Sequence, residues 1–291
     1  MGVNLQIAAN MIDVLRRATA ANLGSTLRQG ATVHLPAPGR VVMSGDLHDH
    51  RLNFQRLCIL AALSKGLNRH LILHELCHGP HLVNGMDLSI RMVGLAAQLK
   101  LEYPQQVHFL QANHDLAQAR GEDILKAGRS VVAAFNDGVA YMYGDDAPAV
   151  CAALAAFIKS LPLAVRLPNG ILCTHSLPSP VQLPAFDPAV LERVPDEADL
   201  SPGGSGHMLI WGRNHTQALA DQLAQTWGVR VFVMGHQPAD MGHETQGQTM
   251  LILSSDGNHG VGLPIDLSRS YTRDELVDEL HPLAGVPMRM D

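Results

Sequence analysis

The feature that most constrains the fold is a set of short apolar runs that each stop at a polar cluster and alternate with longer stretches of helical periodicity. The apolar runs predict buried strands at 41–43, 70–73, 107–110, 171–173, 231–234 and 250–253. Apolar residues recur at helical spacing around 52–64, 87–101, 149–159 and 216–227. Strands that alternate with helices in this way predict a layered α/β fold.

The length of the chain favours one large domain. Its 291 residues can bury a substantial core, and a single domain is a simpler arrangement than two small ones. Apolar residues from Leu5 to Leu15 recur at helical spacing and precede a connector that is rich in Pro and Gly. We therefore expect 1–38 to form an N-terminal helix and connector, and 39–291 to form the main domain of a single globular unit.

Charge and cysteine usage exclude several classes of protein. A formal net charge of −6, with 16% charged residues, provides no basic stripe for nucleic acid, so no nucleic-acid partner is expected. The four cysteines lie far apart without C-x-x-C spacing and are expected to be reduced, structural thiols. A secretory leader pattern and a long apolar stretch are both missing from the sequence, which predicts a cytoplasmic protein without a membrane partner.

Polar side chains that bind metals follow five successive predicted strands. They are Asp46 and His48 after the first strand, Glu75 after the second, Asn113 after the third, His175 after the fourth and His236 after the fifth. Open α/β sheets place their ligand sites at the carboxyl ends of strands. Carboxylate, amide and imidazole groups together are typical of sites for two divalent cations, with manganese, iron, zinc and cobalt all compatible.

The chemistry of such a centre suggests a role for each ligand. Asp46, His48 and Glu75 are expected to bind one ion, and Glu75, Asn113, His175 and His236 the other. Glu75 is the expected bridge because a carboxylate has two oxygens to share, whereas a neutral imidazole has a single lone pair. Its neighbour His74 is expected to face away, because successive side chains of a regular strand point to opposite faces.

An acid and a nucleophile complete the expected reaction. His114 follows a predicted ligand and is the candidate general acid, while Asp115 is expected to fix the tautomer of His114 by accepting its second N–H. The nucleophile would be hydroxide bound to the metals, without attack by a protein side chain.

These motifs resemble those of the phosphoprotein phosphatases, within the wider calcineurin-like metallophosphoesterases. The resemblance runs from about Gly39 to about Gly260. The run Gly45-Asp46-Leu47-His48 is similar to the family's opening G-D-x-H, Asn113-His114-Asp115 to its G-N-H-E, and Gly235-His236-Gln237 to its last ligand motif. The resemblance implies two mixed β-sheets packed face to face as a sandwich and flanked by helices. It also implies the ligand roles given above and His114 as general acid.

The second motif departs from the family pattern. Where the family has G-D-x-x-D-R-G, this chain has His74-Glu75-Leu76-Cys77-His78-Gly79-Pro80. The bridging Asp is thus replaced by Glu75, and the phosphate-binding Arg of the motif is missing. The resemblance implies that Arg213, in Ile210-Trp211-Gly212-Arg213, is a phosphate clamp, and His78 is the next candidate for binding substrate.

The expected activity is hydrolysis of phosphomonoesters, with phosphoserine and phosphothreonine of proteins as the leading substrates. One alternative is a small-molecule or dinucleotide polyphosphate hydrolase, favoured if the flexible segment 195–206 closes the pocket. Another is a catalytically weak protein that binds metal and phosphorylated partners. The His114-Asp115 pair argues against that last alternative, because a binding module needs no general acid.

Overall fold

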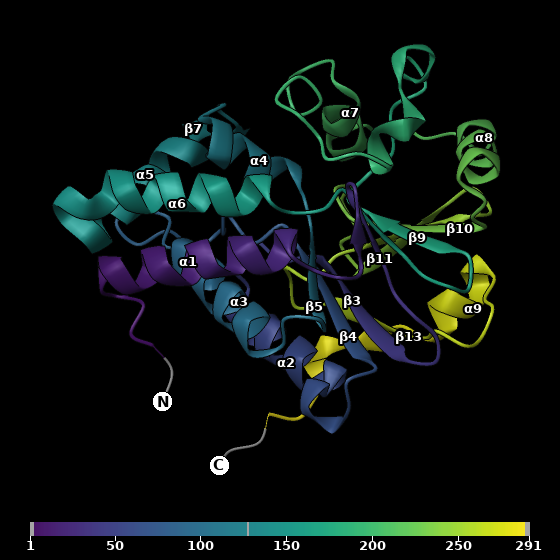
Figure 1. Ribbon diagram of the computed structural model, residues 1–291, viewed down its shortest axis with the longest axis horizontal. Coiled ribbons are helices and arrows are strands. Elements are labelled where there is room, and N and C mark those ends of the chain that lie inside the picture. Colours follow the sequence, from purple (N-terminus) through teal and green to yellow (C-terminus); the bar gives the residue numbers. More distant parts are fainter. Residues whose placement is uncertain (1–2, 127, 289–291) are drawn as a thin grey trace.

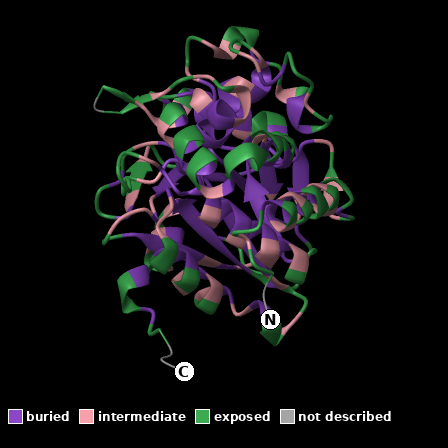
Figure 2. Ribbon diagram, turned by 90° about the vertical axis from the view of Figure 1, so that its left-hand side faces the viewer, coloured by how far each residue is buried: buried purple, intermediate pink, exposed green. Residues whose placement is uncertain are grey.

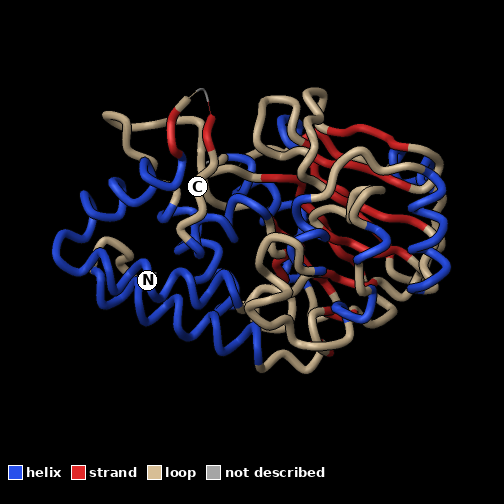
Figure 3. Tube along the Cα trace, turned by 90° about the horizontal axis from the view of Figure 1, so that it is seen from above, coloured by secondary structure: helices blue, strands red, loops and turns tan. Residues whose placement is uncertain are grey.

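The computed structural model describes residues 3–126 and 128–288. Two large sheets pack face to face, and helices cover the outer face of each (Figures 1 and 3). The helices are α1 (Ala8–Leu23), α2 (Arg51–Ala61), α3 (Ile90–Glu102), α4 (Asn113–Arg120), α5 (Val131–Tyr143), α6 (Ala147–Lys159), α7 (Ser205–Trp211), α8 (Gln217–Trp227) and α9 (Arg273–Asp278). The expected sandwich, flanked by helices, is confirmed.

The larger sheet is seven-stranded and mixed, with the strand order β1-β2-β8-β9-β10-β12-β11. Its strands are β1 (Arg28–Gln29), β2 (Thr32–His34), β8 (Ala164–Arg166), β9 (Ile171–Thr174), β10 (Val231–Met234), β11 (His243–Gln246) and β12 (Met250–Leu253). β10 is parallel to both β9 and β12. The carboxyl ends of these three central strands therefore point to the same edge.

The second sheet is five-stranded, with the order β14-β13-β3-β4-β5. Its strands are β3 (Arg40–Asp46), β4 (Arg69–His74), β5 (Val107–Leu110), β13 (Val261–Asp266) and β14 (His281–Pro282). β3, β4 and β5 are parallel neighbours. A separate hairpin is formed by β6 (Leu125–Lys126) and β7 (Arg129–Ser130).

Alternation along the strands explains why their sequences are apolar throughout. In β4, Leu71 and Leu73 pack with the helices on the outer face, while Ile72 packs into the core between the sheets. In β9, Leu172 faces α7 and α8, while Cys173 faces the other sheet. Because both faces of each central strand are buried, the runs lack the polar alternation of a half-exposed strand. Figure 2 shows the buried residues gathered in these central strands.

The N-terminal segment is part of the same folded unit. Helix α1 packs against α3 and α6, and β2 pairs with β8 in the larger sheet. The structure therefore gives no reason to separate 1–38 from the rest of the chain, and the division at residue 38 stays a prediction.

All four cysteines are free. Within the described residues, no helix is both long and apolar enough to span a bilayer.

The backbones of the two sheets meet at the end of β3. A bulge interrupts the pairing of β3 with β4 between Met43 and Asp46, and Asp46 forms a bridge with Ser254, just beyond β12. Gly45 makes this approach possible, because a Cβ atom there would lie 2.4 Å from the backbone nitrogen of Ser254. The edge where the sheets meet is the edge at which the predicted ligands lie.

Candidate metal centre

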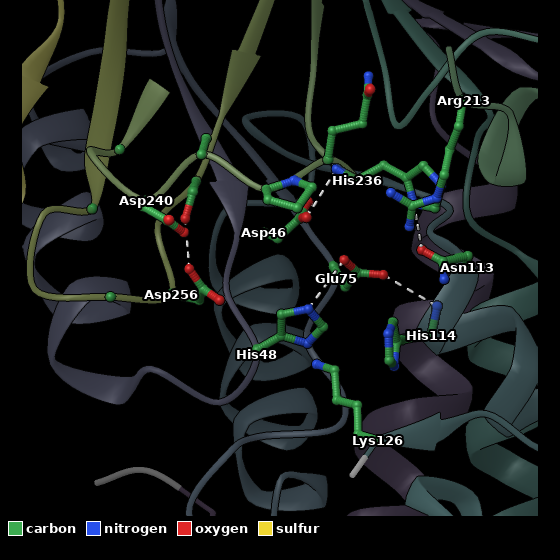
Figure 4. Close-up of a pocket in the computed structure, with 17 residues that line it drawn as sticks. Asp46, His48, Glu75, Asn113, His114, Lys126, Arg213, His236, Asp240 and Asp256 are labelled. Carbon is green, nitrogen blue, oxygen red and sulfur yellow. Dashed lines mark hydrogen bonds and ion pairs between the residues drawn. The ribbon is translucent and has the colours of Figure 1, made fainter. Parts of the chain in front are cut away.

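All six predicted ligands lie at carboxyl ends of strands or in the turns that follow. They are Asp46 at the end of β3, His48 in the next turn, Glu75 after β4, Asn113 at the start of α4, His175 after β9 and His236 after β10. Five of them line one cavity (Figure 4), and the sixth, His175, reaches the same place through its contact with Asn113 Oδ1 at 2.9 Å. Each is buried.

Unusual backbone conformations direct these side chains inward. The φ angle is +41° at His48, +50° at Glu75 and +68° at His236. Non-glycine residues seldom adopt this left-handed region, and such conformations cluster at functional sites where the surrounding structure holds them. The carbonyl oxygen of Glu75 accepts the N–H groups of Leu47 and His48, at 3.1 and 2.8 Å. The turns after β3 and β4 are thereby tied to each other.

One cluster of ligand-type atoms is formed by Asp46, His74 and His175. The Nε2 atom of His74 lies 3.6 Å from Asp46 Oδ1, and His175 Nδ1 lies 3.7 Å from the same oxygen. The expectation that His74 faces away is therefore wrong. Strand alternation no longer applies here, because β4 ends at His74 and the next residue, Glu75, is left-handed.

The second cluster is formed by His48, Glu75 and His114. His48 Nε2 lies 3.3 Å from Glu75 Oε2, and the backbone N–H of His114 donates to Glu75 Oε1 at 3.1 Å. The same Oε1 atom lies 3.5 Å from His175 Nε2, which belongs to the first cluster. The two oxygens of Glu75 thus face different clusters, as a bridging carboxylate requires.

Asn113 and His236 lie beside the first cluster. The Asn113 Oδ1 atom accepts hydrogen bonds from His175 Nε2 and His236 Nδ1, both at 2.9 Å. The backbone N–H of His236 donates to Asp46 Oδ2 at 2.9 Å. Asn113 is thereby placed where its amide oxygen meets imidazole nitrogens from two strands of the larger sheet.

Three buried polar atoms of this centre have no hydrogen-bond partner among the described residues. They are Asp46 Oδ1, His74 Nε2 and His236 Nε2. Folded proteins rarely leave such atoms unsatisfied, because burial without a partner costs about 1–3 kcal/mol each. These free atoms are a carboxylate oxygen and two imidazole nitrogens of the same centre, and divalent transition metals prefer such ligands. The residues therefore fit bound metal.

The two central carboxylates differ in their electrostatic environment. Burial raises the pKa of Asp46 well above its ordinary value, and the nearby Glu75 raises it further. Burial acts in the same direction on Glu75, but the imidazoles of His175 and His48 outweigh it and hold the pKa of Glu75 well below its ordinary value. Glu75 is thus ionised and ready to bind cations.

Most imidazoles of the centre are neutral without metal. Burial lowers the pKa of His74 and of His236 to about 4, and it lowers the pKa of His175 well below its ordinary value. In His48, Glu75 outweighs burial and raises the pKa. Neutral imidazoles keep the lone pair that a metal ligand needs.

His114 is oriented by a chain of hydrogen bonds through His78. Gln118 Nε2 donates to Asn136 Oδ1, which leaves Gln118 Oε1 to accept from His78 Nε2 at 3.0 Å. His78 Nδ1 then accepts from His114 Nδ1 at 2.9 Å. In this arrangement, neutral His114 carries its proton on Nδ1, and its Nε2 atom is free. Burial lowers the pKa of His114 to about 3.

Asp115 and His78 do not make the contacts that the sequence analysis predicts for them. The carboxylate of Asp115 accepts the backbone N–H groups of Leu76 and Cys77, the latter at 2.9 Å, so it orders the turn after β4. The ring of His114 contacts His78 instead of Asp115. His78 is buried, with both ring nitrogens in the chain described above, and it is not among the residues found to line the cavity.

The cavity has a volume of about 430 Å³ and carries charge on its walls. Arg213 and Lys126 supply positive charge, the former from the loop after α7 and the latter from the β6–β7 hairpin. Asp240 and Asp256 line another part of the wall (Figure 4). None of the lining residues identified in the described chain comes from 195–206, so that segment does not close the cavity.

The fold is a metallophosphoesterase-type sandwich, with clustered His, Asp and Glu side chains where the sheets meet. A protein serine/threonine phosphatase from Saccharomyces cerevisiae has the same fold, with a TM-score of 0.65 and 15% sequence identity over 89% of this chain and 82% of that one. A cold-active protein-tyrosine phosphatase of the psychrophile Shewanella is also similar, with a TM-score of 0.57 and 14% identity over 84% of this chain and 80% of that one.

These likenesses confirm the phosphoprotein phosphatase-like resemblance at the level of the fold. No protein-family profile matches the sequence, and no curated protein matches it significantly. The likeness to these proteins therefore lies in the fold, with little sequence identity.

Proposed function

We propose that this chain is a metal-dependent phosphoesterase that hydrolyses phosphomonoesters, with phosphoserine and phosphothreonine of proteins as the leading substrates. The observation that carries the proposal is the convergence of Asp46, Glu75 and several histidines on two adjoining clusters of atoms of the kinds that bind metals. Two of the proteins that share the fold are protein phosphatases, which supports the reaction class.

The proposed cofactor is a pair of divalent cations, with manganese, iron, zinc and cobalt as candidates. Asp46, His48, Glu75, Asn113, His175 and His236 would hold them. When bound, such ions neutralise charge on a phosphoryl group and activate water as the nucleophile. The chain itself positions Glu75 between the two clusters and keeps most of the imidazoles neutral.

Arg213 and Lys126 are proposed to bind the phosphoryl oxygens. Both line the cavity and both are exposed at its wall, where an incoming dianion can reach them. Figure 4 shows them approaching from different sides. Arg213 offers a planar fork of donors that matches phosphate oxygens, whereas Lys126 offers a single ammonium.

His114 is proposed to protonate the leaving oxygen through Nε2. Its Nδ1 proton is committed to His78, so the proton that it transfers must be a second one. The low pKa of about 3 disfavours that imidazolium in the empty site. A bound phosphoester adds negative charge beside the ring, and negative charge favours the protonated form. We therefore expect His114 to gain that proton when substrate binds.

The walls of the cavity favour a phosphomonoester on a protein over a dinucleotide polyphosphate. Asp240 and Asp256 would repel a string of additional phosphates. The cavity is also not closed by 195–206, so a phosphorylated side chain on a bulky partner can enter.

Metal analysis combined with a substrate panel tests the proposal. The purified protein is stripped with a chelator and reconstituted separately with manganese, zinc, iron and cobalt. We expect about two ions per chain, and metal-dependent hydrolysis of phosphoserine and phosphothreonine peptides that exceeds hydrolysis of diadenosine tetraphosphate. Glu75→Gln serves as the control variant, because it removes charge from between the two clusters and should lose at least one ion.

Three outcomes would count against the proposal in different ways. Trace metal after every reconstitution would exclude the metal centre. Preferential hydrolysis of the dinucleotide would leave the centre intact and favour the polyphosphate alternative. Two bound ions without hydrolysis of any phosphoester would favour a protein that binds metal and phosphorylated partners.

A further inference from the structure

His74 stands where the phosphoprotein phosphatase pattern has a glycine, and its ring lies inside the proposed metal centre. The residue is 1% exposed at the end of β4. Its Nε2 atom faces Asp46 Oδ1 at 3.6 Å, and His175 Nδ1 faces that oxygen at 3.7 Å. Neither His74 Nε2 nor Asp46 Oδ1 has a hydrogen-bond partner among the described residues.

The separation of these atoms is too long for a hydrogen bond and suits a shared cation. Hydrogen bonds to oxygen from nitrogen donors span about 2.7–3.2 Å. Two ligand atoms that each lie about 2.1 Å from a tetrahedral ion are about 3.4 Å apart, from simple geometry. The distances of 3.6 and 3.7 Å from Asp46 Oδ1 to the two imidazoles are close to that value.

The local backbone points the His74 side chain toward the centre, and a neighbouring glycine leaves space for its ring. Because Glu75 is left-handed, with a φ of +50°, His74 and Glu75 both turn toward the centre instead of pointing to opposite faces. Gly235 leaves space for the ring, since a Cβ atom there would lie 2.7 Å from His74 Cε1 and 2.1 Å from Asp46 Oδ1. A smaller residue at 74 would leave this space empty beside a buried carboxylate.

We propose that His74 is a metal ligand and that it binds the same ion as Asp46 and His175. The proposal rests on the metal centre of the proposed function and adds a seventh ligand to it. A further neutral imidazole makes the donor set of that ion richer in nitrogen. Such a set favours zinc, cobalt or iron over magnesium or calcium, which prefer oxygen ligands.

His70 provides a matched control on the same strand. It is also a buried histidine of β4 and lies four positions before His74, so both belong to the same face of the strand. Its Nδ1 atom pairs with His108 Nε2 at 3.1 Å, away from the ligands. Loss of His70 therefore reproduces the removal of a buried imidazole without removing a proposed ligand.

The experiment measures zinc binding by chelator competition and counts ions per chain in wild type, His74→Ala and His70→Ala. We expect His74→Ala to bind one of its ions more than about 100-fold more weakly, beyond the roughly 10–100-fold typical of a supporting residue outside the ligand shell. Adding imidazole should restore that ion in His74→Ala, because it can refill the vacated position. His70→Ala should bind both ions as wild type does and should not respond to imidazole.

The proposal is overturned if His74→Ala keeps both ions with affinity losses below about 100-fold, or if imidazole restores nothing. If wild type binds two ions while His74→Ala gives either of these results, the proposed function is unaffected and only the role of His74 is excluded. A wild-type protein that binds no zinc would instead remove the metal centre itself, and this inference with it. Circular dichroism of the metal-free variants checks folding. If His74→Ala misfolds, His74→Leu, which fills the space with an apolar side chain, replaces it in the affinity measurement, and that measurement alone then decides.

Discussion

Strained residues are concentrated at the centre. Of the eight described non-glycine residues with positive φ, five lie on the turns that carry or adjoin the ligands: His48, Asp49, Glu75, His78 and His236. A left-handed conformation at such residues costs on the order of 1–3 kcal/mol each and persists only where surrounding contacts hold it. Here the turns are held by backbone N–H groups that donate to the Asp115 carboxylate and to the Glu75 carbonyl. The strain is the means by which adjacent residues present side chains to one cavity.

Replacing His114 tests the acid at the residue scale. His114→Asn should retain metal and lower kcat for alkyl phosphates, which have poor leaving groups, by about 10²–10⁴-fold. Nitrophenyl phosphate should be affected less, because its leaving group departs without a proton. Steady-state kinetics on both substrates with metal analysis provide the measurement. An equal loss on both substrates would contradict the role of His114 as the acid.

The neighbouring Asp115 supplies a contrast for that experiment. Its carboxylate stabilises the turn at Leu76 and Cys77, so Asp115→Ala leaves two buried N–H groups without their acceptor. We expect a loss of unfolding free energy of about 1–3 kcal/mol in denaturant titration, with little change in the ratio of rates for good and poor leaving groups. A leaving-group dependence like that of His114→Asn would instead return Asp115 to the role that the sequence predicts.

At the scale of elements, apolar periodicity predicts the helices and strands with regular patterns and misses the irregular ones. The expected strand at 70–73 and helix at 216–227 correspond to β4 and α8, because both have strong apolar patterns. β13 escaped prediction although it is the partner of β3, since Pro264 and Gly262 interrupt its apolar run. The positions of ligands at strand ends follow from the sequence. The inward turn of His74 does not, because it depends on the φ angle of its neighbour.

The β6–β7 hairpin is an element whose function only the structure suggests. It carries Lys126 to the cavity, while Arg129, on the other strand, is exposed and is not among the lining residues. An exposed charge pair contributes about 0.2–1 kcal/mol, so Lys126→Ala should weaken inhibition by inorganic phosphate about 1.5- to 5-fold. Arg129→Ala should leave the inhibition constant unchanged, and Arg213→Ala should weaken inhibition at least as much as Lys126→Ala. Equal inhibition constants for wild type and Lys126→Ala would show that the hairpin takes no part in binding phosphate.

At the scale of the whole molecule, the centre joins the two sheets. Asp46, His74 and Glu75 come from the five-stranded sheet, whereas His175 and His236 come from the seven-stranded sheet. Three buried polar atoms of the centre have no hydrogen-bond partner among the described residues, and burial together with the nearby Glu75 raises the pKa of Asp46. Bound cations would satisfy those atoms across the interface and offset the repulsion between Asp46 and Glu75.

Metal should therefore stabilise the packing of the sheets against each other. At a free metal concentration 100 times the dissociation constant, each ion that binds only the folded state adds about 2.7 kcal/mol to the unfolding free energy. We expect denaturant titrations with zinc and with chelator to differ by at least this amount. Asp46→Asn on one sheet and His236→Ala on the other should each remove much of the difference, because either change breaks the link between the sheets. Their metal-free stabilities should stay near that of the metal-free wild type, since neither side chain belongs to an apolar core. If zinc and chelator give the same unfolding free energy in wild type, the sheets are held together without metal, and the centre has no part in the stability of the fold.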